Sequence, residues 1–261
     1  MERRTLLRGL GLVAAGGAWG LAVPRTATAA GGGTPSESVT PDEALERLIA
    51  GNRRFVAGEL LHPHQDVERR IEVAPSQHPF ASVFSCIDSR VPPEVVFDQG
   101  LGDLFVIRDA AQNLDALIQG SVEYGPVENG TPLVVVMGHQ RCGAVIAAVE
   151  SLEHGVDLGP YLNEIVAALK PAYDAAKASG VPAEELVDAT IRQQTALTVQ
   201  VLAADPRLVP LVDAGALAIQ GAYYSLDTGE VSWSGLDDQA QASGRLVSRR
   251  GRRESQPSSV R

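Results

Sequence analysis

Two short segments of the chain carry the side chains best suited to chemistry, SCIDSR at 85–90 and GHQRCG at 138–143. Together they supply two thiols, an imidazole, a carboxylate and a guanidinium, from Cys86, Cys142, His139, Asp88 and Arg90. The two cysteines are the only ones in 261 residues. Two thiolates and one imidazole suit a catalytic zinc, which keeps one coordination position open. The segments therefore predict a zinc site with Cys86, His139 and Cys142 as ligands.

Asp88 and Arg90 predict a charged pair beside that metal. Asp88 follows Cys86 by two residues, close enough to be a fourth ligand or to lie next to the ion. The planar guanidinium of Arg90 can bind a carboxylate through two parallel hydrogen bonds. An Asp88–Arg90 pair would hold the carboxylate ionised and away from the metal, which leaves the open position to water.

The elements that would position these side chains are two buried strands and one helix. The apolar runs at 81–84 and 133–137 predict strands that end just before the two segments. The run at 143–152 predicts a helix that starts at Cys142, and a helix N-terminus favours the thiolate form of a cysteine. Ligands of open α/β sheets bind beyond the carboxyl ends of the strands, where both segments would lie.

The rest of the predicted domain, at 40–235, supports an α/β fold. Thr40 and Glu43 predict a capping box at the start of its first helix. Further strands are expected at 104–107, 214–226 and 231–233, and further helices at 114–124, 160–178 and 183–204. Strands that alternate with helices indicate a single domain with a mainly parallel central β-sheet of four or more strands, flanked by helices.

Composition narrows the classes of function. The formal net charge of −10 argues against a nucleic-acid partner. A hydrophobic fraction of 44% is ordinary for a globular protein, and no run in the predicted domain is long and apolar enough to span a membrane. Residues 236–261 are basic and predict a disordered tail, either solvated without a partner or in contact with wall polymers or acidic lipid.

The N-terminal region has the pattern of an export signal. Residues 1–29 combine Arg3-Arg4, an apolar stretch and Ala27-Thr28-Ala29, which is typical of a cleaved twin-arginine signal peptide. The general secretory route and an uncleaved membrane anchor are the alternatives. A flexible linker is expected at 30–39. The protein is therefore expected in the periplasm or on the extracellular or cell-wall side.

The segments around the predicted ligands resemble the β-class carbonic anhydrases. The resemblance covers about residues 41 to 235, and its motifs, in the family's order, are GNxRF at 51–55, CIDSRVPPE at 86–94, FDQGLGDLF at 97–105, GSVEY at 120–124 and GHxxCG at 138–143. It implies one zinc ion per subunit and the reversible hydration of carbon dioxide to bicarbonate and a proton, by attack of a zinc-bound hydroxide on CO₂. It also implies a homodimer or homotetramer.

The same resemblance implies roles for side chains other than the ligands. Asp88, paired with Arg90, would accept a hydrogen bond from the hydroxide, or would move onto the zinc in a closed state at lower pH. Gln77, Phe105 and Tyr124 would bind substrate and serve the zinc of the neighbouring subunit, although both aromatic rings also suit ordinary core packing. The apolar face of the first predicted helix is expected to pack on that neighbour.

One segment departs from the family pattern. RDAAQN at 108–113 stands where the family usually shows Arg-Asn-Ala-Gly-Asn, so that Asp109 and Ala111 replace Asn and Gly. The change from Gly to Ala matters if the backbone there needs a positive φ angle. The carboxylate of Asp109 could also alter the charge near the pocket. The departure is expected to affect rate and substrate preference more than fold.

Other interpretations fit some of these residues. Cys86 and Cys142 could form a disulfide, as cysteines in exported proteins often do. The scaffold could instead hydrolyse carbon disulfide or carbonyl sulfide, because those hydrolases share the fold and the zinc ligands, or it could be a binding module that retains zinc without turnover. His62 and His64 are interpreted as part of a surface loop, because no cluster of carboxylates or thiols accompanies them.

Overall fold

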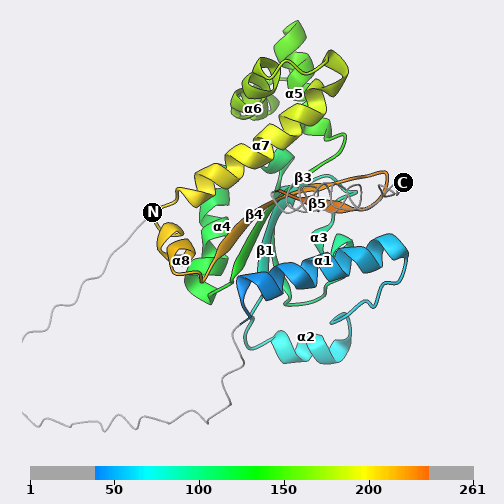
Figure 1. Cartoon of the computed structure of the whole chain (residues 1–261), viewed down its shortest axis with the longest axis vertical. Coiled ribbons are helices and arrows are strands. Elements are labelled where there is room, and N and C mark those ends of the chain that lie inside the picture. The colour runs from blue at the N-terminus through cyan, green and yellow to red at the C-terminus, as the bar shows by residue number, and fades with distance from the viewer. Residues whose placement is uncertain (1–38, 235–261) are drawn as a thin grey trace, which may run out of the picture. The chain divides into compact units, whose positions relative to one another are not determined.

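A computed structural model describes residues 39–234 of the chain (Figure 1). The predicted signal peptide, the predicted linker up to residue 38 and the predicted basic tail lie outside the described residues. None of the helices within 39–234 is long and apolar enough to cross a membrane.

The described residues build one five-stranded sheet in the order β2-β1-β3-β4-β5. Its strands are Ala81–Cys86 (β1), Leu104–Asp109 (β2), Leu133–His139 (β3), Ala218–Tyr224 (β4) and Val231–Trp233 (β5). The first four strands of the chain run parallel to one another, and β5 pairs antiparallel with β4. The prediction of a mainly parallel sheet of four or more strands is confirmed.

Helices cover both faces of this sheet (Figure 1). They are Pro41–Ala57 (α1), Val67–Val73 (α2), Pro93–Val96 (α3), Ala116–Asn129 (α4), Gly143–His154 (α5), Pro160–Ala178 (α6), Leu186–Ala203 (α7) and Val209–Asp213 (α8), with short 3₁₀ turns at Ala110–Gln112 (η1) and Ala183–Glu185 (η2). Core side chains of α1 pack on one face, those of α4 and α7 pack on the other, and α5 and α6 form a third cluster with α7.

Three of these helices, α2, α3 and α8, were not expected from the sequence, and two predicted elements start at clearly different residues. All three helices are too short to show a helical repeat of apolar residues. The predicted strand at 214–226 shrinks to β4, because α8 and the left-handed Gly215 precede it. The predicted helix at 114–124 starts later, since the Asp115 carboxylate accepts hydrogen bonds from the backbone N–H groups of Leu117 and Ile118 and so caps α4.

The apolar face of α1 packs largely within its own chain, where a neighbouring subunit was expected, and contact of the exposed Val56 with a neighbour stays a prediction. Ala44 and Leu48 are fully buried in the same cluster as Val83, Phe97 and Trp233. The predicted capping box is present, because the Thr40 hydroxyl and the Glu43 carboxylate bind each other's backbone N–H groups. The sheet itself supplies the surface that this amphipathic helix needs.

The GNxRF motif explains how α1 is fixed to the rest of the fold. A Cβ atom on Gly51 would lie 1.7 Å from the Phe97 carbonyl oxygen, so only glycine allows this approach. The buried Asn52 amide donates to the carbonyl oxygens of Val96 and Gly229, and its oxygen accepts from the Val231 N–H. One side chain therefore joins α1, the end of α3 and the β4–β5 hairpin.

Asn52→Ala is expected to lower the free energy of unfolding by about 3 kcal/mol, because it leaves three buried backbone groups without a partner. Denaturant unfolding would measure the loss. The exposed neighbour Arg53→Ala is the control and should change stability by less than about 0.5 kcal/mol. Equal stability of the two variants would contradict this role for Asn52.

Parallel pairing brings the predicted ligand segments to one edge of the sheet. Cys86 is the last residue of β1 and His139 is the last residue of β3. The two strands are neighbours and run in the same direction, and both are fully buried. Their carboxyl ends therefore present Cys86 and His139 side by side.

Candidate metal centre

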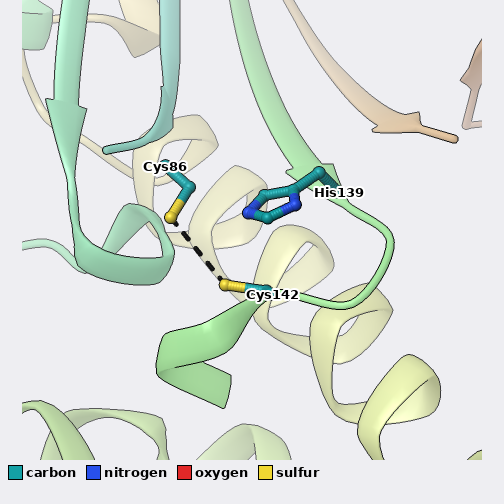
Figure 2. A group of neighbouring side chains, drawn as sticks. All are labelled: Cys86, His139 and Cys142. Carbon is teal, nitrogen blue, oxygen red and sulfur yellow. Dashed lines mark hydrogen bonds between the residues drawn. The ribbon is translucent and has the colours of Figure 1, made fainter. Parts of the chain in front are cut away.

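Cys86, His139 and Cys142 meet at that edge (Figure 2). Their ligand atoms all lie within 4.8 Å of one another, and the two sulfur atoms are 3.8 Å apart. The side chains are buried, with exposed fractions of 3% for Cys86, 0% for His139 and 1% for Cys142. Between residues 39 and 234 no other group of three or more such ligands is found.

The loop that joins His139 to Cys142 is held in place by contacts from another part of the chain. Arg141 adopts a left-handed backbone conformation with φ of 52°, which turns the chain sharply from His139 to Cys142, the N-cap of α5. The Asp227 carboxylate accepts from Arg141 at 2.7 and 2.9 Å and from the Gln140 side chain at 2.9 Å. The turn between β4 and β5 therefore fixes Gln140 and Arg141, the two residues that separate the predicted ligands.

The donor set fits a metal ion. The Nδ1 atom of His139 lies 3.0 Å from the Gln140 carbonyl oxygen and donates to it, so Nε2 carries the free lone pair. This Nε2 atom is buried and has no hydrogen-bond partner among the described residues. Buried polar atoms rarely lack a partner, and an imidazole oriented through its other nitrogen is the usual arrangement at a zinc site.

Cys86 and Cys142 are free thiols, with sulfur atoms much farther apart than the roughly 2.05 Å of a disulfide. The hydrogen bond from Cys142 lowers the pKa of Cys86, helped by His139 and the Ala111 N–H and opposed by burial. The same contact and burial raise the pKa of Cys142, although N–H groups of the first turn of α5 act in the opposite direction. Cys86 is therefore the more acidic thiol, whereas the helix N-terminus alone favours Cys142.

Asp88 and Arg90 form the predicted pair beside the ligands. The Arg90 guanidinium donates to both Asp88 oxygens, at 2.9 and 2.6 Å, and the Arg90 N–H donates to Oδ1 at 2.9 Å. These bonds, with a contribution from His139, lower the pKa of Asp88 to about 2. Asp88 Oδ2 lies 3.9 Å from His139 Nε2, so the ionised carboxylate borders the ligand cluster.

Arg108 is a site residue that the sequence interpretation missed. It follows the apolar part of β2, and its guanidinium donates to the carbonyl oxygens of Cys86 at 2.9 Å and Asp88 at 2.6 Å. It therefore fixes the backbone that carries a ligand and the carboxylate. The sequence does contain a signal for this role, which is a charged residue at the end of a predicted strand. A guanidinium that is partly buried there must find hydrogen-bond acceptors.

The two departures from the family pattern both lie against Cys86. Ala111 has φ of 60° and ψ of 30°, the left-handed conformation that favours glycine, and its N–H lies 3.3 Å from the Cys86 sulfur. The Asp109 carboxylate accepts from the Asn113 N–H at 2.8 Å. Burial, followed by repulsion from Cys86 and Asp115, raises the pKa of Asp109 to about 7.

Asp109→Asn is expected to stabilise the metal-free protein by about 1–2 kcal/mol at pH 8. The folded-state pKa of about 7 exceeds the unfolded value near 4, so stability is lost as pH rises through this window. The substitution removes this pH-dependent loss of stability, so the stabilisation that it brings should vanish near pH 4. Thermal unfolding of chelator-stripped protein at both pH values measures the difference, and an equal gain at pH 4 and pH 8 would contradict the assignment.

The structure brings two of the three predicted substrate residues together. The Phe105 and Tyr124 rings meet edge to face with centroids 5.7 Å apart and line a groove of about 500 Å³ between β2 and α4. Phe105 pairs with Ser82, four residues before Cys86, so it lies about 13 Å along the sheet from the ligand edge. Gln77 lies exposed in the segment before β1. Within one chain, the groove and the ligand cluster are separate.

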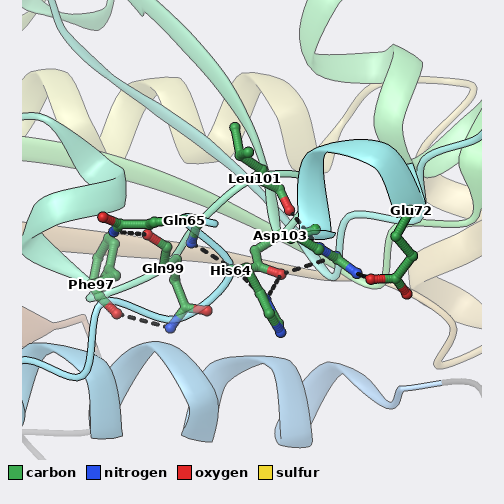
Figure 3. A network of polar contacts seen from close by, with 9 residues as sticks. His64, Gln65, Glu72, Phe97, Gln99, Leu101 and Asp103 are labelled. Atoms are coloured by element: carbon green, nitrogen blue, oxygen red, sulfur yellow. Dashed lines mark hydrogen bonds and ion pairs between the residues drawn. The ribbon is translucent and has the colours of Figure 1, made fainter. Parts of the chain in front are cut away.

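His62 and His64 do not belong to a metal-ligand cluster within the described part of the chain. His64 Nδ1 instead lies 2.7 and 2.8 Å from the two oxygens of the buried Asp103 (Figure 3). The Gly100 N–H and the Arg69 guanidinium donate to the same carboxylate. The half-exposed His64 therefore anchors the loop after α1, in agreement with its interpretation as a loop residue.

Comparison with known proteins identifies the family. The carbonic anhydrase family model matches residues 81–231. Carbonic anhydrase 2 of Mycobacterium tuberculosis is 39% identical over 74% of this chain and 92% of its own length, and the carbonic anhydrase of Mycolicibacterium smegmatis is 38% identical over 73% and 92%. A tetrameric β-carbonic anhydrase from Sordaria macrospora shares the fold, with a TM-score of 0.60, 21% identity and coverage of 73% of this chain and 96% of that one. The chain therefore belongs to the β-class carbonic anhydrases.

Proposed function

We propose that this protein catalyses the reversible hydration of carbon dioxide to bicarbonate and a proton, with one zinc ion per subunit held by Cys86, His139 and Cys142. The observation that carries the proposal is the buried His139 Nε2, which has no hydrogen-bond partner among the described residues, in a cluster whose three ligand atoms lie within 4.8 Å of one another. When bound, zinc supplies the Lewis acidity that lowers the pKa of water to about 7. Membership of the family supports carbon dioxide as the substrate.

Asp88 would orient the reacting water. Because Arg90 keeps it ionised, the carboxylate accepts hydrogen bonds and cannot donate one. Its Oδ2 atom borders the ligand cluster, within reach of a water bound there. Arg90 also donates to the Arg141 carbonyl oxygen at 3.3 Å, which ties the carboxylate to the loop that carries His139 and Cys142. This pairing favours the open state, in which Asp88 is not a ligand.

A second copy of the chain would complete the active site. The groove lined by Phe105 and Tyr124 is open, and its lining includes Leu117, which is 81% exposed. An exposed apolar side chain at the rim of an apolar groove favours burial by a partner. We propose a homodimer or homotetramer in which Gln77, Phe105 and Tyr124 serve the metal centre of the neighbouring subunit.

Leu117→Asp is expected to weaken this assembly at least tenfold, because a carboxylate would be buried against apolar side chains. Size-exclusion chromatography with light scattering over a dilution series gives the dissociation constant. Tyr161→Asp is the matched control, since Tyr161 on α6 is 86% exposed and is not among the residues that line the groove. Equal assembly of both variants would contradict the proposed interface.

A hydrolase of carbon disulfide or carbonyl sulfide is the second candidate, since such enzymes resemble this family in fold and ligands. Parallel assays of the zinc-loaded full chain distinguish the two. The proposal predicts rapid hydration of carbon dioxide in a stopped-flow indicator assay and slow hydrolysis of the sulfur compounds. Rapid release of sulfide without hydration of carbon dioxide would replace the proposed function. Failure on all three substrates by a zinc-replete protein would indicate a binding role.

A further inference from the structure

A cluster of polar side chains is buried between α7 and η1, behind the ligand Cys86. Its members are at most 8% exposed and are Gln112, Asn113, Gln194, Thr195 and Thr198. Buried amides and hydroxyls are costly unless their hydrogen bonds are satisfied. Neither the packing of α7 nor the set of proposed metal ligands explains why these polar side chains are buried beside the metal centre. Their burial therefore indicates a further role.

The hydrogen bonds of this cluster run from α7 to η1. The Gln194 amide nitrogen lies 3.1 Å from Asn113 Oδ1 and 3.4 Å from the Gln112 carbonyl oxygen, and donates to both. The Thr195 hydroxyl accepts from the Gln112 side-chain amide at 3.1 Å and donates to the Ile191 carbonyl oxygen. Two consecutive residues of α7 thus hold Gln112 and Asn113 from one side.

The turn that they hold is unfavourable by itself. Ala111 and Gln112 both have left-handed backbones, with φ of 60° and 46°. Residues with a Cβ atom avoid this region, and two in succession persist only where surrounding contacts impose the conformation. Contacts from α7 come from Gln194 and Thr195, with a longer bond from Thr198 to Gln112, and they add to the local bonds of Asn113 within the turn. The result is that the Ala111 N–H points at the Cys86 sulfur, 3.3 Å away.

The same helix also lies against the backbone that leads to the second ligand. Gly138 directly precedes His139, and a Cβ atom on it would lie 2.5 Å from the Thr195 hydroxyl oxygen and 3.2 Å from the Gln112 amide nitrogen. The cluster therefore packs directly on the end of β3. One short stretch of α7 supports the approaches to both Cys86 and His139.

We propose that Gln194 and Thr195 are positioning residues of the metal centre. They hold the left-handed turn at Ala111–Gln112 so that its N–H donates to the Cys86 thiolate and orients this ligand. The inference rests on the proposed function, because it requires Cys86 to bind the metal. Partners of ligating side chains typically change metal affinity by about 10–100-fold, so the effect should be measurable without a catalytic assay.

The test compares Gln194→Met and Thr195→Val with wild type, using the full chain loaded with zinc or with cobalt. Both substitutions keep side-chain size and remove the hydrogen-bonding groups. We expect zinc affinity, measured by chelator competition, to fall about tenfold or more in Gln194→Met. The sulfur-to-cobalt charge-transfer band should move to lower energy in both variants, because a thiolate that loses an N–H donor holds its electrons less tightly. Gln200→Met, at an exposed position of the same helix, is the control and should match wild type in both measurements.

A merely structural role predicts a different result. Both variants would then unfold at a lower temperature, with unchanged zinc affinity and an unchanged cobalt spectrum, and that outcome would overturn the inference. If Gln194→Met does not fold, Thr195→Val decides by the same two measurements. A wild-type chain that binds neither zinc nor cobalt would overturn the proposed function itself, whereas a wild type that binds both while the variants match it would overturn the positioning role alone.

Discussion

Cys142→Ser is expected to abolish zinc binding and carbon dioxide hydration together. Residues that only support ligands already contribute about 10–100-fold to metal affinity, so loss of a ligand should cost more than about a hundredfold. Serine is a poor substitute, because its hydroxyl does not ionise near neutral pH as a thiolate does. The remaining pair, Cys86 and His139, would leave the ion with two protein ligands.

Metal analysis of the purified variant, with stopped-flow hydration of carbon dioxide on the same sample, measures both losses. Ala144→Ser is a matched control, since it introduces the same hydroxyl in the first turn of α5 at a position that is not a predicted ligand. The control should retain one zinc per chain. A Cys142→Ser protein with wild-type zinc content would show that the metal is held elsewhere.

Asp88→Asn is expected to retain zinc and lose about a hundredfold or more in turnover, the range that loss of orientation of a reacting group costs. Asn has the size of Asp, but it is neutral and turns an amide N–H₂ toward one of the two Arg90 donors. It therefore no longer offers two acceptor oxygens at the edge of the ligand cluster. Zinc should stay bound, because Asp88 is paired with Arg90 and is not required as a ligand.

The matched control for this prediction is Asp174→Asn, which breaks an exposed pair with Lys170 on α6. Its turnover and zinc content should equal those of wild type. Full activity of Asp88→Asn would show that the assigned role is wrong, and loss of zinc from it would identify Asp88 as a ligand at rest. Arg90 lowers the pKa of Asp88 to about 2, so we expect a change of activity near neutral pH to come from another group.

The pH dependence of stability follows from the same pair. The folded-state pKa of Asp88 lies below its unfolded value near 4, so the pair stabilises the fold above about pH 4, and this contribution is lost as pH falls toward 2. Asp109 acts in the opposite direction, because its raised pKa costs stability as pH rises toward 7. Asp88, two residues beyond β1, and Asp109, the last residue of β2, therefore respond oppositely to acid.

The cluster of Cys86, His139 and Cys142 was predictable because its signals are local. The ligand segments directly follow apolar strands, and the parallel pairing of β1 and β3 then places Cys86 and His139 at one edge. The Asp88–Arg90 pair spans only two residues, so its geometry is set within a single turn. In both cases the residue types and their spacing along the chain determine most of the geometry of the side chains.

The features that were missed depend on contacts distant in sequence. The Gln194 bonds to Gln112 and Asn113 join residues 82 and 81 positions apart, and no periodicity in α7 marks them. The face of α1 was assigned to a neighbouring subunit from the family resemblance, since amphipathicity shows that a helix is buried without showing against what. The left-handed turn at Ala111 was only suspected, since alanine gives no signal for positive φ and glycine does.

Stopped-flow hydration of carbon dioxide by the full chain, while zinc is titrated into the metal-free protein, tests the proposed function most directly. We expect activity to rise in proportion to bound zinc, to level off at one ion per chain, and to increase with pH through a pKa near neutrality. Wild-type protein saturated with zinc that does not hydrate carbon dioxide at any pH would contradict the proposed function.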